Sequence, residues 1–153
     1  MRRYAQSTAV PIDRSKAEIE RTLMRFGASH FLYGFGDNRA MLVFQFKGKR
    51  LRFNLQMPDR KDFSTSPTGR RRKSTTVIDK AWEQAGRQAW RALALSIKAK
   101  LVAVTDGISV FEDEFLAWMV MPDGKTVSEH VLPQVESIYQ SGKMPKALLP
   151  WTG

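Results

Sequence analysis

The longest periodic stretch in this chain is RRRKSTTVIDKAWEQAGRQAWRALALSIKAK, residues 70–100. It begins with four consecutive cations and continues with apolar residues at helical spacing, which predicts a helix from about Thr76 to Val104. Because successive residues of a helix lie about 100° apart, one side of this helix is apolar and would cover a sheet. The residues of that side are Ile78, Trp82, Ala85, Ala89, Leu93 and Ser96.

The other side of this helix carries a row of cations. Lys80, Arg87, Arg91 and Lys98 are spaced seven, four and seven residues apart, so they fall close to one line along the helix. We expect this row to face solvent and to form one positive surface with the cations of residues 70–73. An ordinary solvated helix face is the plainer alternative.

The chain before residue 58 predicts a helix followed by a sheet. A helix of about three turns follows Pro11-Ile12-Asp13 and ends at Gly27, which suits a helix C-terminus. Three runs with the alternation of strands follow, at 30–36, 40–47 and 50–57, separated by turn signals. They predict an antiparallel meander with one apolar face.

The chain after residue 105 predicts shorter helices. Residues 109–120 and 126–139 are amphipathic, Pro133 predicts a bend or interruption in the second, and the apolar tail with Trp151 is expected to dock. Three Ser/Thr-x-x-Glu motifs predict capping boxes at helix N-termini. They are Ser15 with Glu18, Ser109 with Glu112, and Thr126 with Glu129.

Together these patterns predict a single α+β domain over residues 1–153. Its elements are an N-terminal helix, a three-stranded antiparallel β-meander, a long basic amphipathic helix, and two or three short C-terminal helices. Residues 58–76 are rich in Pro, Gly, Ser and Thr and end in cations, so they predict a mobile basic loop.

Charge is distributed unevenly along the chain, whose formal net charge is +10. Residues 1–105 contain 22 Lys/Arg against 8 Asp/Glu, whereas residues 106–153 contain 3 against 7. A local positive field favours polyanions such as nucleic acid, and guanidinium groups suit phosphate because they donate two parallel hydrogen bonds to it. The candidate nucleic-acid contacts are Lys49, Arg50, Arg52, Arg70, Arg71, Arg72, Lys73, Lys80, Arg87, Arg91 and Lys98, with Tyr33 and Trp90 as candidates for base stacking.

These features predict a DNA-binding protein that contacts the phosphate backbone with little sequence specificity, since no helix-turn-helix or zinc-finger pattern is present. Single-stranded DNA is slightly favoured over duplex because aromatic residues accompany the cations, and RNA is a further possible ligand. The alternative is an inhibitor or adaptor that uses the same surface to bind another protein. The charge split also permits homo-oligomers in which basic and acidic regions meet.

Catalysis is not expected, because the chain has no Cys, only two His and no recognisable nucleophile motif. The acidic run Glu112-Asp113-Glu114 leaves an Mg²⁺- or Mn²⁺-dependent nuclease as a remote alternative, although acids at a helix start are better explained by capping. No cofactor or metal is implied. The sequence has no apolar run long enough for a membrane span and no apolar signal segment, which predicts a cytoplasmic protein.

Residues 10–23, VPIDRSKAEIERTL, and residues 90–104, WRALALSIKAKLVAV, resemble a family of small proteins encoded by temperate bacteriophages and prophages of proteobacteria. The resemblance covers most of the chain and brings no catalytic motif. It implies a viral protein in the host cytoplasm, with a role in DNA metabolism or in countering a host defence. Under the inhibitor or adaptor alternative, the resemblance implies a phage protein that binds a host protein. A meander followed by a long basic helix is also similar, at fold level, to single-strand annealing proteins, although this chain is short for one.

Overall fold

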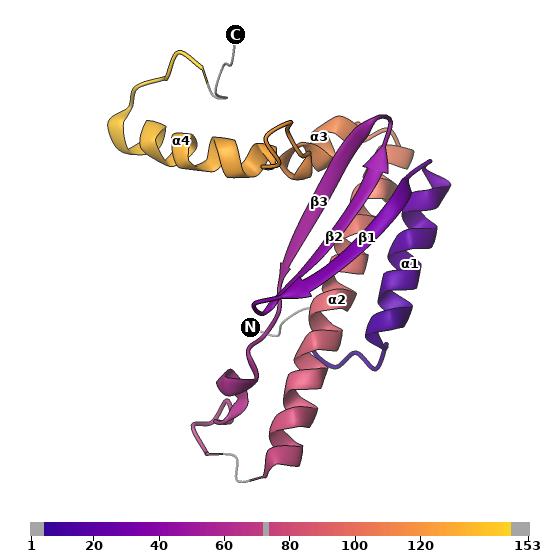
Figure 1. The fold of residues 1–153 in the computed structure, drawn as a ribbon, viewed down its shortest axis with the longest axis vertical. Coiled ribbons are helices and arrows are strands. Elements are labelled where there is room, and N and C mark those ends of the chain that lie inside the picture. The colour runs from indigo at the N-terminus through magenta and orange to yellow at the C-terminus, as the bar shows by residue number, and fades with distance from the viewer. Residues whose placement is uncertain (1–4, 72–73, 148–153) are drawn as a thin grey trace.

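The computed structural model describes residues 5–71 and 74–147, and it confirms the predicted α+β fold (Figure 1). The tail residue Trp151 therefore lies outside the described residues. The elements in chain order are α1 (Ile12–Arg25), β1 (Ser29–Gly36), β2 (Arg39–Phe46), β3 (Lys49–Gln56), the 3₁₀ helix η1 (Arg60–Phe63), α2 (Thr75–Thr105), α3 (Phe111–Phe115), the 3₁₀ helix η2 (Leu116–Trp118) and α4 (Val127–Ser141).

The three strands form an antiparallel sheet in the order β1-β2-β3, as predicted, with bounds within one residue of the expected ones. Both hairpins turn through two residues with positive φ, Asp37-Asn38 and Lys47-Gly48. Turns of this kind match the right-handed twist of the strands they join. The sequence signals at these turns therefore determined the register of the meander.

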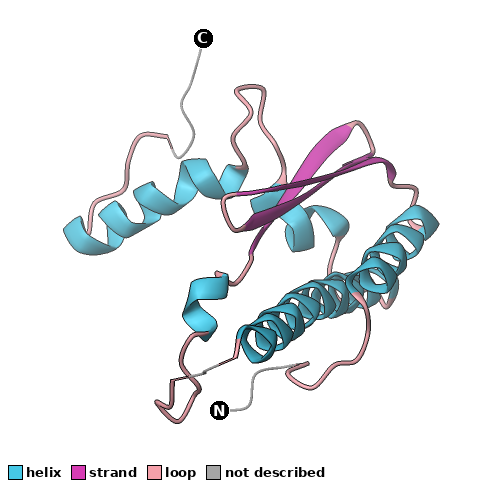
Figure 2. Cartoon of the chain, turned by 60° about the horizontal axis from the view of Figure 1, so that its bottom comes forward, coloured by secondary structure: helices cyan, strands magenta, loops and turns pink. Residues whose placement is uncertain are grey.

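One face of the sheet carries the core. Leu42, Phe44, Leu51 and Phe53 point from β2 and β3 into the protein and are buried. α1 and α2 pack side by side over this face, and they run in the same direction (Figures 1 and 2). No described helix covers the opposite face.

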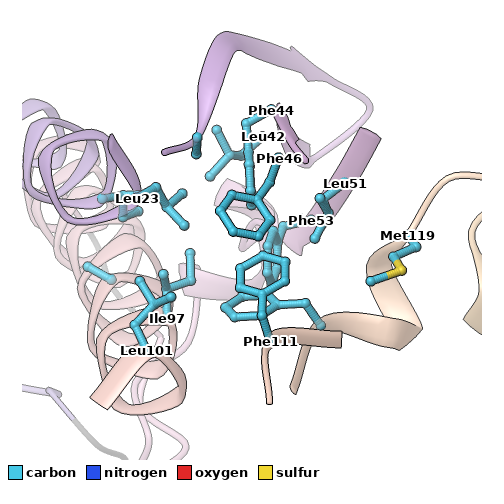
Figure 3. Packing of buried hydrophobic residues seen from close by; sticks show 14 of the residues in the cluster. Leu23, Leu42, Phe44, Phe46, Leu51, Phe53, Ile97, Leu101, Phe111 and Met119 are labelled. Atoms are coloured by element: carbon cyan, nitrogen blue, oxygen red, sulfur yellow. The ribbon is translucent and has the colours of Figure 1, made fainter. Parts of the chain in front are cut away.

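The two helices and α3 fill the space beneath the sheet. Leu23 of α1 and Ile97 and Leu101 of α2 point toward the phenylalanines of β2 and β3, and Phe111 of α3 joins them from one end (Figure 3). The ring of Phe111 lies 3.9 Å from that of Phe46, measured between centroids. Aromatic residues thus make up much of the core.

The buried face of α2 differs from the predicted one. Its buried residues are Gly86, Trp90, Ala94, Ile97 and Leu101. Four of them lie one position after the predicted Ala85, Ala89, Leu93 and Ser96, so the helix is rotated by about 100° from the expected orientation.

The neighbouring helix α1 explains this rotation. α2 must bury one flank against α1 as well as one against the sheet, and Trp90 fills the corner between them beside Tyr33. Trp82, predicted to be buried, is instead 37% exposed and donates its indole N–H to the carbonyl of Pro58 at 2.9 Å. The apolar residues of α2 cover more than half of its circumference, so the sequence pattern permitted both orientations.

The segment between β3 and α2 contains more regular structure than the predicted loop. It includes η1, an isolated bridge between Thr65 and Arg71, and an ion pair between Arg60 and Asp79 of α2. The helix then begins at Thr75. Mobility of this segment stays a prediction.

Only one of the three predicted capping boxes forms. Thr126 and Glu129 cap α4 reciprocally, as predicted. The other two motifs do not cap, because α1 begins after Pro11 and α3 begins after Val110. Neither Pro11 nor Val110 has a side chain that accepts a capping hydrogen bond. Ser15 lies inside α1, fully buried, and its hydroxyl has no hydrogen-bond partner among the described residues.

α4 extends away from the sheet and from the other helices (Figure 1). It continues through Pro133 to Ser141, so the predicted interruption there is wrong. None of its residues is buried, in contrast to α1 and α2. No helix in the described ranges is long and apolar enough to cross a membrane.

Candidate nucleic-acid interface

The predicted cationic row of α2 lies along the seam between α2 and α1. Arg91 forms an ion pair with Glu18 of α1, with 2.5 Å between Nη1 and Oε2. Arg87 donates through Nε and Nη2 to the side-chain oxygen of Gln84, at 3.1 and 2.6 Å. The expectation that both arginines face open solvent is therefore wrong.

The two ends of that row are available. Lys80 and Lys98 are exposed, and neither forms an ion pair with another described residue. Lys80 lies in the first turns of α2, which project beyond the sheet (Figure 1). Lys98 lies near the other end, beside the last turns of α1.

The cations predicted outside α2 are spread over the molecule. Lys49 and Arg50 are exposed where β3 begins, at the end of the sheet away from η1 (Figure 1). Arg70 and Arg71 are exposed near the start of α2, whereas Arg72 and Lys73 lie outside the described residues. The described members of the predicted set therefore do not form one continuous surface.

Arg52 of β3 is engaged within the protein. Its Nη2 lies 2.6 Å from Oε2 of Glu129, and its Nη1 donates to the carbonyl of Gly124 at 2.8 Å. The backbone N–H of Thr126, followed by the charge of Arg52, lowers the pKa of Glu129. Arg52 thus anchors the start of α4 and is not a free cation.

The two rings proposed for stacking face the interior. Trp90 is 3% exposed, so the expectation that its edge borders an open surface is wrong. Tyr33 is half-buried, with its ring centroid 6.0 Å from that of Trp90. Burial is the main reason that the pKa of the Tyr33 hydroxyl is raised, and Glu20 adds to it.

A second row of cations, which the sequence analysis missed, lies on α1. Arg14, Arg21 and Arg25 are all exposed and lie opposite the buried face formed by Ile19 and Leu23. They are spaced seven and four residues apart, the same spacing that revealed the row on α2. Applying the helical wheel to residues 12–25 would have found them.

The rows of α1 and α2 meet in a cleft. Arg21, Arg25 and Lys98 line it, and none of them pairs with a carboxylate among the described residues. The cleft has a volume of about 420 Å³, and its single acid, Glu18, is already paired with Arg91. Three unpaired cations around one hollow give it an excess of positive charge, and guanidinium and ammonium groups in such an arrangement favour anions.

Two further acids and one histidine have structural partners. Glu114 pairs with Lys100, and His130 lies 2.7 Å from Asp123, whose pKa is lowered by the backbone N–H of Lys125 and then by His130. Within residues 5–71 and 74–147, no three acidic or histidine side chains gather to hold a metal ion.

Comparison with known proteins adds no assignment to this geometry. No family model, curated protein or solved structure matches this chain.

Proposed function

We propose that this protein binds the phosphate backbone of nucleic acid across the outer face of α1 and α2, with little sequence specificity. The observation that carries the proposal is the cleft in which Arg21, Arg25 and Lys98 converge without acidic partners in the described ranges. The two arginines bring donor forks that match phosphate oxygens. Arg14 extends the same face along α1.

Single-stranded DNA is the favoured ligand, with RNA and duplex as alternatives. α1 and α2 lie side by side over the sheet, so neither is presented alone as a helix that enters a major groove. A shallow seam lined by cations suits a flexible backbone that follows it. The resemblance to phage-encoded proteins supports phage DNA metabolism as the setting.

The test compares two triple variants that remove the same charge. Arg21→Gln/Arg25→Gln/Lys98→Gln removes the cleft cations, and Lys125→Gln/Lys143→Gln/Lys146→Gln removes three exposed cations of the C-terminal part. Fluorescently labelled single-stranded DNA, duplex DNA and RNA are titrated at several salt concentrations.

We expect the cleft variant to lose at least about tenfold in affinity at low salt and the control less than about threefold. Because each phosphate contact with a single strand contributes about 0.7 to the logarithmic salt dependence, the cleft variant should flatten that slope by about two. Equal losses in the two variants, or no binding by the unmodified protein at low salt, would overturn the proposal.

A protein-binding adaptor is the second candidate, and α4 is the observation that favours it. Leu132 and Tyr139 are 57% and 86% exposed on a helix with no buried residue. The first partner to test is a second copy, because the acidic region after residue 105 complements the basic region before it. Sedimentation equilibrium should then show a dimer that Leu132→Ser/Tyr139→Ser dissociates, and a monomer at all concentrations would exclude self-association through α4.

A further inference from the structure

A larger hollow lies at the start of α1, away from the cationic cleft. The segment before α1, the end of β1, the residues after β3 and the middle of α2 form its walls, and its volume is about 860 Å³. This volume is within the range of small-molecule sites, about 300–1,000 Å³. The hollow is therefore large enough for a ligand such as a nucleotide.

Two exposed aromatic rings line this hollow. Phe35, at the end of β1, is 72% exposed, whereas Phe31 and Tyr33 on the same face of the strand are partly buried and pack against the core. Trp82 of α2 is partly exposed, and its hydrogen bond to Pro58 holds its indole ring in place. Exposed rings gathered at one hollow favour a flat apolar ligand over a purely ionic one.

A positioned cation stands beside these rings. Arg87 lines the hollow, and its Nε and Nη2 are held by the side-chain oxygen of Gln84. The amide nitrogen of Gln84 in turn donates to the carbonyls of Gln6 and Thr8, at 3.3 and 2.7 Å. Arg87 has no carboxylate partner among the described residues, and its Nη1 forms no bond with them.

This arrangement fixes an arginine before a ligand arrives. A guanidinium held through one edge keeps its remaining N–H groups directed and available, which lowers the entropic cost of binding an anion. A second cation, Lys16, lines the hollow with its Nζ 4.8 Å from the ring centroid of Trp90. The positive charge of Lys16 therefore lies over Trp90, a third aromatic residue that lines the hollow.

The hollow also contains two acids, Asp13 and Glu83. Carboxylates accept hydrogen bonds from the amino groups of adenine, cytosine and guanine but repel a bare polyanion. A flat ring with amino groups and a single attached phosphate complements the aromatic rings, the carboxylates and the cations of the hollow. A nucleotide has this chemistry.

We propose that this hollow binds one unstacked nucleotide, with the base against Phe35 and Trp82 and the phosphate at Arg87. The inference rests on the proposed function when the nucleotide belongs to a bound strand. Arg87 is one helical turn before Arg91 in the row that runs toward the cationic cleft, so one strand would reach both places. A free nucleotide is the other source of the same chemistry.

The test uses Phe35→Ala, with Leu32→Ala as its matched control. Both residues are large, apolar and exposed on β1, but Leu32 pairs with Val43 on the opposite face of the sheet. Tryptophan fluorescence is followed while three probes are added, namely a single-stranded oligonucleotide, the same oligonucleotide with abasic sites, and an adenosine or cytidine monophosphate. Arg87→Gln is measured in parallel, with Arg39→Gln, an exposed arginine of β2, as its control.

We expect Phe35→Ala to weaken binding of the normal oligonucleotide by about 5- to 140-fold, the loss that goes with one stacked base. The unmodified protein should bind the abasic oligonucleotide more weakly than the normal one, by a similar factor. Phe35→Ala and the unmodified protein should bind the abasic oligonucleotide with the same affinity. Leu32→Ala and Arg39→Gln should bind like the unmodified protein, and Arg87→Gln should bind more weakly than either.

The outcomes separate the two proposals. If Phe35→Ala and the abasic probe cause no loss while the Arg21/Arg25/Lys98 variant still binds weakly, the nucleotide site is overturned and the proposed function stands. If no oligonucleotide binds, the proposed function is overturned. The titration with the monophosphate then decides whether the hollow binds a free nucleotide. Saturable quenching by the monophosphate that Phe35→Ala abolishes supports a free-nucleotide site, and no quenching overturns it.

Discussion

α2 and α4 are both amphipathic helices, but the protein holds them in different ways. α2 has five buried residues, four of which belong to the core, whereas α4 has none. α4 is attached by polar contacts near its start, chiefly those of Arg52 with Glu129 and with the carbonyl of Gly124. An amphipathic pattern thus shows that a helix has an apolar side, but it does not show whether the same chain covers that side.

The two helices also lie in regions of opposite charge. α2 and α1 carry the cations of the cleft, and α4 follows the switch to a net acidic composition after residue 105. The core therefore supports the basic face, and the acidic helix projects from it (Figure 1). Substitutions in the two helices should accordingly have different consequences.

The largest difference should appear on replacing aromatic residues. Trp90→Ala should lower the free energy of unfolding by about 3–5 kcal/mol, because it removes a buried ring from α2. Trp82→Ala should lower the free energy of unfolding by about 1–1.5 kcal/mol, because it removes one hydrogen bond and a partly buried ring. Tyr139→Ala on α4 should change the free energy of unfolding by no more than about 0.5 kcal/mol. Urea unfolding measures all three, and a larger loss for Trp82 than for Trp90 would restore the orientation of α2 predicted from the sequence.

Acid should loosen α4 before it affects the core. The pKa of Glu129 is lowered in the folded protein, so its stabilising contribution is complete above the ordinary glutamate pKa of about 4.3 and disappears as the pH falls through the lower folded value. Glu129→Gln should remove about 1 kcal/mol from the helix start at neutral pH and most of this acid sensitivity.

Hydrogen exchange of the α4 amides between pH 5 and about pH 2.5 measures that change, with Glu136→Gln on the same helix as the control. If α4 and the core lose protection together in the unmodified protein, α4 is not the separately anchored element described above.

Two glycines should respond with opposite signs. Gly86 lies inside α2, where an added Cβ meets Ile12 and Met57 at ordinary contact distances of 3.5 and 3.6 Å, so Gly86→Ala should stabilise the protein by about 0.5–1 kcal/mol. Gly142 ends α4 with a φ of +67°, and Gly142→Ala should destabilise that end by about 1 kcal/mol. Thermal unfolding measures the effect of Gly86→Ala, and circular dichroism measures the helix content lost from α4 in Gly142→Ala. The predicted contrast is wrong if both substitutions destabilise the protein.

The smallest effect should come from the two arginine–glutamate pairs. Double-mutant cycles on Arg91 with Glu18, and on Arg52 with Glu129, should give coupling energies of about 0.5–1 kcal/mol, with the first pair less exposed and at least as strongly coupled. A coupling energy of zero between Arg91 and Glu18 would mean that Arg91 is not neutralised and counts among the free cations of the α1–α2 face.

Much of the fold was predictable because its signals are local. Alternating residues between two-residue turns determined the strands, and a glycine suited to positive φ determined the end of α1. Capping motifs were less reliable, since only Thr126 with Glu129 occupies a helix start. A capping motif also requires the helix to begin at that residue, and this depends on how the preceding chain packs.

The candidate site was only partly predictable. The cations of α2 were identified, but Arg91 is neutralised by Glu18, 73 residues away in the sequence, and α1 supplies the arginines that complete the cleft. Phe35 and Trp82 also line one hollow from distant segments. None of these contacts has a signal in the local sequence.

The sequence by itself determined the elements, their order, the meander and the uneven charge, because hydrophobic period, turn residues and composition act within a few neighbouring residues. Only the tertiary structure decided the rotation of α2, the pairing of its arginines, and which cations and rings remain open to a ligand. Those features depend on α1 lying beside α2 over the same face of the sheet, and the free energy of that packing is distributed over side chains far apart in the chain.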